Sequence, residues 1–286
     1  MAATVAVIQT DPSLLACQLR RLDPHVALSE AGRPHDAYGF GYYSSGGVLL
    51  GKRPSGAPAL LSLFGLTGAI HSEAIVAHAR HATVGAQKDE NTHPFRYRRW
   101  LFAQDGTVEG FAQVRPRLLA SLPDHLQRQV EGETDAEHVF VTFLDLLRKD
   151  GHSLEDYDLE PAAAAQALAR TVRQVDAWCR DAGVQRASAL SLLATNGRIL
   201  VAVRRGQPLH YALLEGIVPC ALHEIDASTP ESDPRLRAHR VVKAVCLASR
   251  LAQQNGFIEV PEGSAVAVSR GLQVSVSSLA AAAGGS

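Results

Sequence analysis

The chain has 286 residues, enough for one large domain or two small ones with a substantial apolar core. Hydrophobic residues make up 46% and charged residues 20% of it, a composition that excludes extensive disorder. The 28 Lys and Arg residues balance 29 Asp and Glu residues, and the resulting net charge of −1 argues against a dedicated nucleic-acid binder.

No apolar run approaches the roughly 18 residues that a membrane helix needs, and the first residues lack the basic region of a secretory signal. The four cysteines are far apart and form no CxxC motif, so their spacing indicates neither a zinc site nor a disulfide framework. We therefore predict a cytoplasmic protein with no metal, no cofactor and no membrane contact, and a flexible tail over residues 280–286.

The N-terminal part predicts a strand, a helix and a hairpin. Residues 3–9 favour a buried strand, and Asp11 followed by Pro12 favours the start of a helix. Residues 37–53 are typical of two strands joined by a Gly-Gly turn. Gly39 and Gly41 could belong to a phosphate-binding loop, but no strand–glycine–helix pattern surrounds them, so a turn of the strand is the better interpretation.

The middle of the chain predicts two more strands and then helices. Residues 74–84 and 98–106 favour strands, and residues 107–130 are mixed with a helical tendency. The clearest helix follows Thr134, which forms a capping box with Glu137, and ends near Lys149. A second helix is predicted over about 161–181.

The C-terminal third is mostly strand. Residues 189–205 form a hairpin pattern around Asn196-Gly197, and residues 244–249 and 264–269 favour further strands. The order of strands, two central helices and strands, without regular βαβ alternation, predicts an α+β fold of antiparallel sheets covered by helices.

Three segments carry more specific polar residues than a fold needs. They are residues 78–85 with 91–95, residues 102–107, and residues 132–137. An arginine at a strand end offers a fork for a carboxylate, and a glycine after a strand exposes an N–H that can stabilise an oxyanion. An aspartate in the first turn of a helix can bind an ammonium group. Together these groups would hold a free amino acid by both of its charged ends.

The three segments resemble the class II glutamine amidotransferases of the N-terminal-nucleophile hydrolase superfamily, and within it the small standalone γ-glutamyl hydrolases of ergothioneine and glutathione metabolism. Arg80 and Thr83 match the R-x-x-T of that family, and His93-Pro94 follows at the family's spacing. Asp105-Gly106 stands where the family has Asn-Gly, and the run from Thr134 to Glu137 matches its T-D-x-E. Residues 37–43 and the pattern from Cys246 to Ser264 extend the likeness over nearly the whole chain.

The resemblance implies a four-layer α/β/β/α sandwich of two antiparallel sheets, as a single domain over residues 1–279. It also implies roles by position. Arg80 and Thr83 would bind the α-carboxylate of a glutamine or γ-glutamyl group, and Asp135 its α-ammonium. The Gly106 N–H would contribute to the oxyanion hole, and His93 would support the pocket wall.

The family nucleophile, a cysteine at the second position, is Ala2 in this chain. Two explanations stay open: a native cysteine replaced by alanine to trap a substrate, or a natural pseudoenzyme. Asp105 is a second departure, because an ionised carboxylate beside the oxyanion opposes the developing charge.

Simpler interpretations exist for several of these residues. Arg80 could form a structural ion pair, and Asp135 could simply favour the helix dipole. His78 and His81 are better explained as satisfied or exposed histidines than as metal ligands. The basic and aromatic run from Arg96 to Trp100 suggests RNA only weakly, and the edge of a hairpin explains it better.

The sequence thus predicts an amidohydrolase that cleaves glutamine or a γ-glutamyl conjugate of a small amine or thiol through a glutamyl thioester, in a biosynthetic or thiol pathway. If ammonia is the product, a separate synthase partner would have to use it. The alternative is a non-catalytic protein that binds a γ-glutamyl ligand or acts as a scaffold. A nucleic-acid accessory role is remote.

Overall fold

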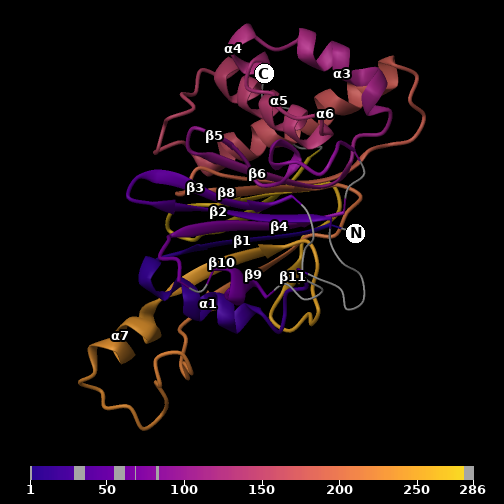
Figure 1. Ribbon diagram of the computed structural model, residues 1–286. Helices are drawn as coiled ribbons and strands as arrows, with labels where there is room; N and C mark the ends of the chain where they lie inside the picture. The colour runs from indigo at the N-terminus through magenta and orange to yellow at the C-terminus, as the bar shows by residue number, and fades with distance from the viewer. Residues whose placement is uncertain (1, 29–35, 55–61, 68, 82–83, 280–286) are drawn as a thin grey trace.

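The computed structural model describes residues 2–28, 36–54, 62–67, 69–81 and 84–279. Within these residues the strands form two antiparallel sheets, which lie face to face in Figure 1. The seven-stranded sheet has the order β11(Ile258–Glu259), β9(His210–Glu215), β10(Lys243–Ala248), β1(Ala3–Gln9), β4(Ala74–Arg80), β2(Ala37–Ser44), β3(Gly47–Arg53). The six-stranded sheet has the order β13(Val274–Ser278), β12(Ser264–Val268), β8(Leu200–Arg204), β7(Ala189–Thr195), β6(Trp100–Thr107), β5(Phe95–Tyr97).

Helices cover the outer face of each sheet, so the predicted four-layer α/β/β/α sandwich is confirmed (Figure 1). The helices α3, α5 and α6 pack on the six-stranded sheet, and α1 and α2 pack on the seven-stranded sheet. Their bounds are α1(Leu15–Leu22), α2(Leu63–Thr67), α3(Phe111–Ala120), α4(Asp124–Gln127), α5(Asp135–Lys149), α6(Pro161–Asp181) and α7(Pro234–Val241), with short 3₁₀ turns at Pro12–Leu14 and Asp89–Asn91. Among the described residues, none of the helices has the length and apolar character needed to cross a bilayer.

An apolar layer joins the two sheets. Alternate residues of β1 point to opposite faces, so Val5 and Val7 pack under α1 while Ala6 and Ile8 face the other sheet. Leu101 and Ala103 of β6 reach into the same layer from above. Tyr43 of β2 adds a polar link, because its hydroxyl oxygen lies 2.7 Å from the Arg99 carbonyl and 2.8 Å from the Thr195 carbonyl of the six-stranded sheet.

Local sequence patterns account for the helix boundaries. Asp11 caps the first turn by accepting the Ser13 N–H at 3.0 Å. Thr134 caps α5 by accepting the Glu137 N–H at 3.3 Å, which confirms that half of the capping box. The Glu137 carboxylate accepts the N–H groups of residues 131 and 132, at 2.9 and 2.8 Å, so it fastens the preceding loop rather than Thr134 itself.

The predicted glycine turns need correction. The β2–β3 hairpin turns at Ser45 and Gly46, both with positive φ, and Gly47 already belongs to β3. Gly39 and Gly41 lie inside β2, not at a turn. A Cβ on Gly39 would lie 2.2 Å from the His93 carbonyl oxygen, so this glycine lets the segment before β5 approach the strand.

The run from Arg96 to Trp100 is a hairpin edge, in which Tyr97 pairs with Trp100. Trp100 is buried. The arginines contact the protein itself: Arg96 donates to the Val48 carbonyl at 3.0 Å, Arg98 pairs with Glu155, and Arg99 donates to the Gly46 carbonyl at 2.6 Å. Each of these three arginines thus has a contact within the protein.

Because Leu101 lies in the layer between the sheets and Leu213 does not, we expect their replacement to change the free energy of unfolding by different amounts. Leu101 is fully buried there, whereas Leu213 of β9 is 56% exposed. We expect Leu101→Ala to lower the free energy of unfolding by about 2–5 kcal/mol, because it removes buried methyl groups and leaves a cavity. The matched change Leu213→Ala should cost less than about 0.5 kcal/mol. Urea titration measures both, and equal losses would contradict this account of the core.

Candidate active site

Strand pairing brings distant polar residues to one end of the sandwich. The start of β1 runs antiparallel to the end of β4, so Thr4 lies opposite His78 and Ala3 opposite Ala79. The end of β6, with Asp105 and Gly106, lies in the facing sheet. Position 2 therefore lies at the same end of the sandwich as the end of β4 and the end of β6, which come about 80 and 100 residues later in the sequence.

Ala2 and Asp105 line one pocket of about 240 Å³. This volume is below the roughly 300–1,000 Å³ of pockets for drug-sized ligands, and it is compatible with part of a single amino acid. The other residues that line it come from the segment leading into β9 and from the end of β10 onward: Gln207, Pro208, His210, Ser249, Arg250, Leu251 and Gln254.

Asp105 faces a histidine rather than a backbone donor. Its Oδ1 lies 3.3 Å from His78 Nε2, within ion-pair distance but outside hydrogen-bond alignment, and both side chains are buried. The His78 ring packs in turn against the His93 ring, with centroids 4.1 Å apart.

His93 is enclosed by the fold. Its ring contacts both His78 and Phe95, at centroid distances of 4.1 and 4.7 Å. Burial, followed by the charges of His78 and Arg80, holds the pKa of His93 well below the usual value of 6.5. His93 is therefore a neutral imidazole at neutral pH.

Arg80 ends β4 with its guanidinium turned to the following loop. It donates to the carbonyls of Ala86 at 3.4 Å and Gly85 at 3.3 Å, and also to that of Val84. Burial lowers the pKa of Arg80, while the nearby carboxylates of Asp36 and Asp135 act in the opposite direction. Thr83, predicted to act with Arg80, lies outside the described residues.

Asp135 begins α5 and points toward β6. Its Oδ2 accepts the Gln104 side-chain amide at 3.0 Å and the Val108 N–H at 2.7 Å. Burial raises the pKa of Asp135, and these hydrogen bonds oppose the rise. Asp135 and Arg80 thus lie within electrostatic reach of each other, although neither lines the Ala2 pocket.

Gly106 has a backbone that other residues tolerate poorly. Its φ is +99°, and a Cβ would lie 1.7 Å from the Ala189 carbonyl oxygen on the neighbouring strand. The glycine predicted for the oxyanion hole is therefore also the residue that lets β6 pair closely with β7.

Sequence reasoning did not single out His210. It is buried at the start of β9, lines the Ala2 pocket, and its Nδ1 has no hydrogen-bond partner among the described residues. Burial lowers its pKa below 6.5. Ser249 is a second such residue, whose hydroxyl accepts the Thr4 N–H at 2.9 Å and so fixes the start of β1. For Ser249, the sequence signal was its place in the Cys246–Leu251 segment, which resembles the family.

A family model described as "Glutamine amidotransferases class-II" matches residues 5–283. The chain belongs to the class II glutamine amidotransferases. The match starts after position 2, so it does not test the nucleophile position.

One curated relative of this amidotransferase is a yeast protein. It is the protein named "Probable glutamine amidotransferase DUG3" of Saccharomyces cerevisiae, 30% identical over 181 residues, which are 59% of this chain and 51% of the relative. The match thus spans about half the length of that relative.

Solved structures of bacterial proteins share the fold. A class II glutamine aminotransferase domain protein from Silicibacter pomeroyi has a TM-score of 0.60 at 17% identity, covering 97% of this chain and 99% of that one. A predicted glutamine amidotransferase from Pseudomonas aeruginosa has a TM-score of 0.55 at 18% identity, covering 96% and 98%. The glutamine phosphoribosylpyrophosphate amidotransferase of B. subtilis has a TM-score of 0.57 at 11% identity, covering 97% of this chain and 49% of its own.

The enclosed ring of His93 predicts a specific pH behaviour. Because its pKa is lowered in the folded state, we expect the ring to stay neutral when the pH falls through 6.5, where an unfolded histidine gains a proton. Its contribution to the free energy of unfolding is therefore retained above pH 6.5 and lost progressively below it. NMR of histidine-labelled protein, with the His93 signal assigned by a His93→Gln variant, measures this. Titration of that signal near pH 6.5 would show that the ring is not enclosed.

The close approach at Gly106 predicts a loss of stability beyond backbone strain. Gly151 also has positive φ, +85°, but a Cβ there would meet nothing within 4 Å. We expect Gly151→Ala to cost about 1 kcal/mol for strain alone, and Gly106→Ala to cost a further 1–3 kcal/mol or so for the collision. Thermal or urea unfolding of both variants isolates the difference, and equal losses would argue against a tight β6–β7 contact.

Proposed function

We propose that this amidotransferase domain binds the γ-glutamyl group of glutamine, or of a γ-glutamyl conjugate of a small amine or thiol, and that position 2 is the place of the nucleophile. The observation that carries this proposal is the common pocket of Ala2 and Asp105, where the start of β1 meets the end of β6. The family match over residues 5–283 supports it independently.

The chemistry requires a cysteine at position 2. Its thiolate would attack the γ-carbonyl carbon, the α-amine of the same residue would carry the proton to the leaving amine, and water would then hydrolyse the glutamyl thioester. The methyl group of Ala2 has no electron pair to donate. The chain with Ala2 would therefore bind the substrate, and position 2 would not attack it.

The remaining groups would recognise the glutamyl part. Arg80, together with Thr83, would bind the α-carboxylate, because a carboxylate is a stronger partner for a guanidinium than the loop carbonyls of Val84, Gly85 and Ala86. Asp135 would bind the α-ammonium, and His93 would hold the wall behind them.

The Gly106 N–H would donate to the oxyanion, and Asp105 is the weak point of this site. A carboxylate there opposes the negative charge that develops on the carbonyl oxygen. The imidazole of its neighbour His78 lies 3.3 Å away, and both side chains are buried. An asparagine at position 105 would donate a hydrogen bond instead, as the family pattern has it.

A non-catalytic binding or scaffolding protein is the second candidate, and the combination of Ala2 with Asp105 favours it, because both changes weaken the same reaction. Under the first function, ammonia released from glutamine needs a synthase partner, whereas hydrolysis of a conjugate needs none. A cytoplasmic location suits either function.

Restoring the thiol tests the proposal. We expect Ala2→Cys, with Met1 removal verified by intact mass, to release glutamate from glutamine or from γ-glutamyl dipeptides, while the parent chain and Ala2→Ser release far less. A coupled glutamate assay measures the rates, and the ranking of substrates distinguishes a glutaminase from a γ-glutamyl hydrolase. Adding Asp105→Asn should raise the rate further, because it supplies an oxyanion donor.

A binding measurement on the parent chain separates the two candidates. Glutamate or glutamine at about 100 times its Kd should add about 2.7 kcal/mol to stability, seen as a rise in Tm. Binding with no turnover by the folded double variant would favour the binding protein. The absence of both binding and turnover would refute the proposed γ-glutamyl pocket.

A further inference from the structure

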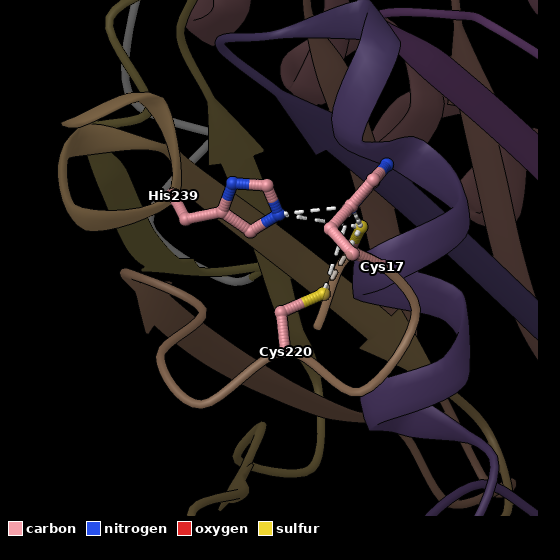
Figure 2. A group of neighbouring side chains, drawn as sticks. Cys17, Cys220 and His239 are labelled. Atoms are coloured by element: carbon pink, nitrogen blue, oxygen red, sulfur yellow. Dashed lines mark hydrogen bonds between the residues drawn. The ribbon is translucent and has the colours of Figure 1, made fainter. Parts of the chain in front are cut away.

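A second group of reactive side chains lies away from the pocket. Cys17 of α1, Cys220 and His223 of the segment after β9, and His239 of α7 bring their ligand atoms within 4.8 Å of one another. Figure 2 shows Cys17, Cys220 and His239 converging from three separate parts of the chain. Cys17, Cys220 and His239 are buried, and His223 is partly exposed.

Five of the six distances between the ligand atoms of this cluster are close to those of a tetrahedron. Zinc bonds of about 2.3 Å to sulfur and 2.0–2.1 Å to nitrogen separate the ligand atoms by about 3.8 Å for two sulfurs, 3.6 Å for sulfur and nitrogen, and 3.4 Å for two nitrogens. The two Sγ atoms lie 3.6 Å apart, and His223 Nδ1 and His239 Nε2 lie 3.1 Å apart. The sulfur–nitrogen distances from Cys17 are 3.2 Å to His223 Nδ1 and 3.8 Å to His239 Nε2, and that from Cys220 to His223 Nδ1 is 3.7 Å.

The tautomer of His239 suits a ligand. Its Nδ1 lies 2.7 Å from the Arg235 carbonyl oxygen, which can only accept, so Nδ1 carries the hydrogen. In the neutral ring, Nε2 then directs its lone pair at Cys17 and His223. Metal-bound histidines commonly donate their other N–H to a carbonyl in this way. A disulfide does not account for the cluster, since the sulfurs are far beyond the roughly 2.05 Å of an S–S bond.

Among the described residues, few apolar side chains hold the surrounding segment to the sandwich. Residues 216–242 leave the sheet between β9 and β10 and extend away from the sandwich as an arm that includes α7 (Figure 1). The cluster sits at the base of this arm with a small apolar group: Leu14, Ile217, Ile225, Leu236 and Val242. So few apolar side chains rarely stabilise a separate unit, and small units of this kind often rely on a metal.

We propose that Cys17, Cys220, His223 and His239 form a structural Zn²⁺ site that fastens the arm, residues 216–242, to helix α1. Four protein ligands leave no open position for a water or substrate, so the site is structural rather than catalytic. It also lies far from the pocket, because β9 starts at His210, which lines the pocket with Ala2, and ends at Glu215 beside the arm, about 16–17 Å along the strand.

Metal analysis of the full chain tests the proposal. After dialysis without chelator, we expect about one zinc per chain, and a drop of at least tenfold in Cys220→Ser and in His223→Gln. The matched controls are Cys179→Ser, a buried thiol of α6, and His125→Gln, an exposed histidine of α4, both of which should keep the metal. Circular dichroism of every variant verifies that it is folded.

Two further readouts do not depend on zinc copurifying with the chain. Cobalt added to the stripped protein should give the visible bands of tetrahedral, thiolate-bound Co²⁺, and these should be absent in Cys220→Ser. Chelation should speed amide exchange across residues 216–242 while leaving β1 and β6 protected. Zinc below one tenth of an equivalent with no cobalt bands, equal metal in variants and controls, or a Cys17–Cys220 disulfide in the alkylated protein would each overturn the proposal.

Discussion

The arrangement of the pocket depends on the apolar layer between the two sheets. In that layer β1 contributes Ala6 and Ile8, and β6 contributes Leu101 and Ala103. Their contact holds the two strands in a set position relative to each other. Ala2 and Asp105 line the pocket where one end of each strand emerges from this layer. A hydrophobic contact outside the pocket therefore holds Ala2 and Asp105, which line it, at a set distance from each other. Because interiors are densely packed, a small change in that layer is transmitted to the pocket rather than absorbed.

Buried polar groups make this end of the molecule different from the rest of the core. His78, His93 and Asp105 occupy space that apolar side chains would fill at lower cost, and several of their polar atoms lack partners in the described part of the chain. Such groups are costly to bury, and they persist where a site uses them. Asp135 differs, since Gln104 and Val108 already satisfy it, and its carboxylate orders the β6–α5 junction as well as carrying charge.

Much of the fold could be predicted from local sequence, because local rules determine it. The Asp11 cap, α5 after Thr134 and α6 at Pro161–Asp181 all follow from spacing within a few turns of helix. The position of Gly39 inside a strand could not be predicted, because the group that requires a glycine there is the carbonyl of His93, more than fifty residues later in the chain. The same limit hid His210, which enters the pocket only through the pairing of β9 with β10. It also hid the Cys17 cluster, whose members show no motif spacing and are brought together only by the arm.

The arm leaves the sheet at Glu215 and returns at Lys243, and these two residues are direct neighbours across β9 and β10. The connection therefore has the geometry of a hairpin, whatever its length. A short turn in its place would keep the register of every strand, and a longer insertion would do so as well. The pairing of β9 with β10 is in this sense independent of what the arm contains. Apart from Cys220, His223, His239 and the small apolar group around them, residues 216–242 can therefore vary in length and sequence without disturbing the pocket at the other end of β9.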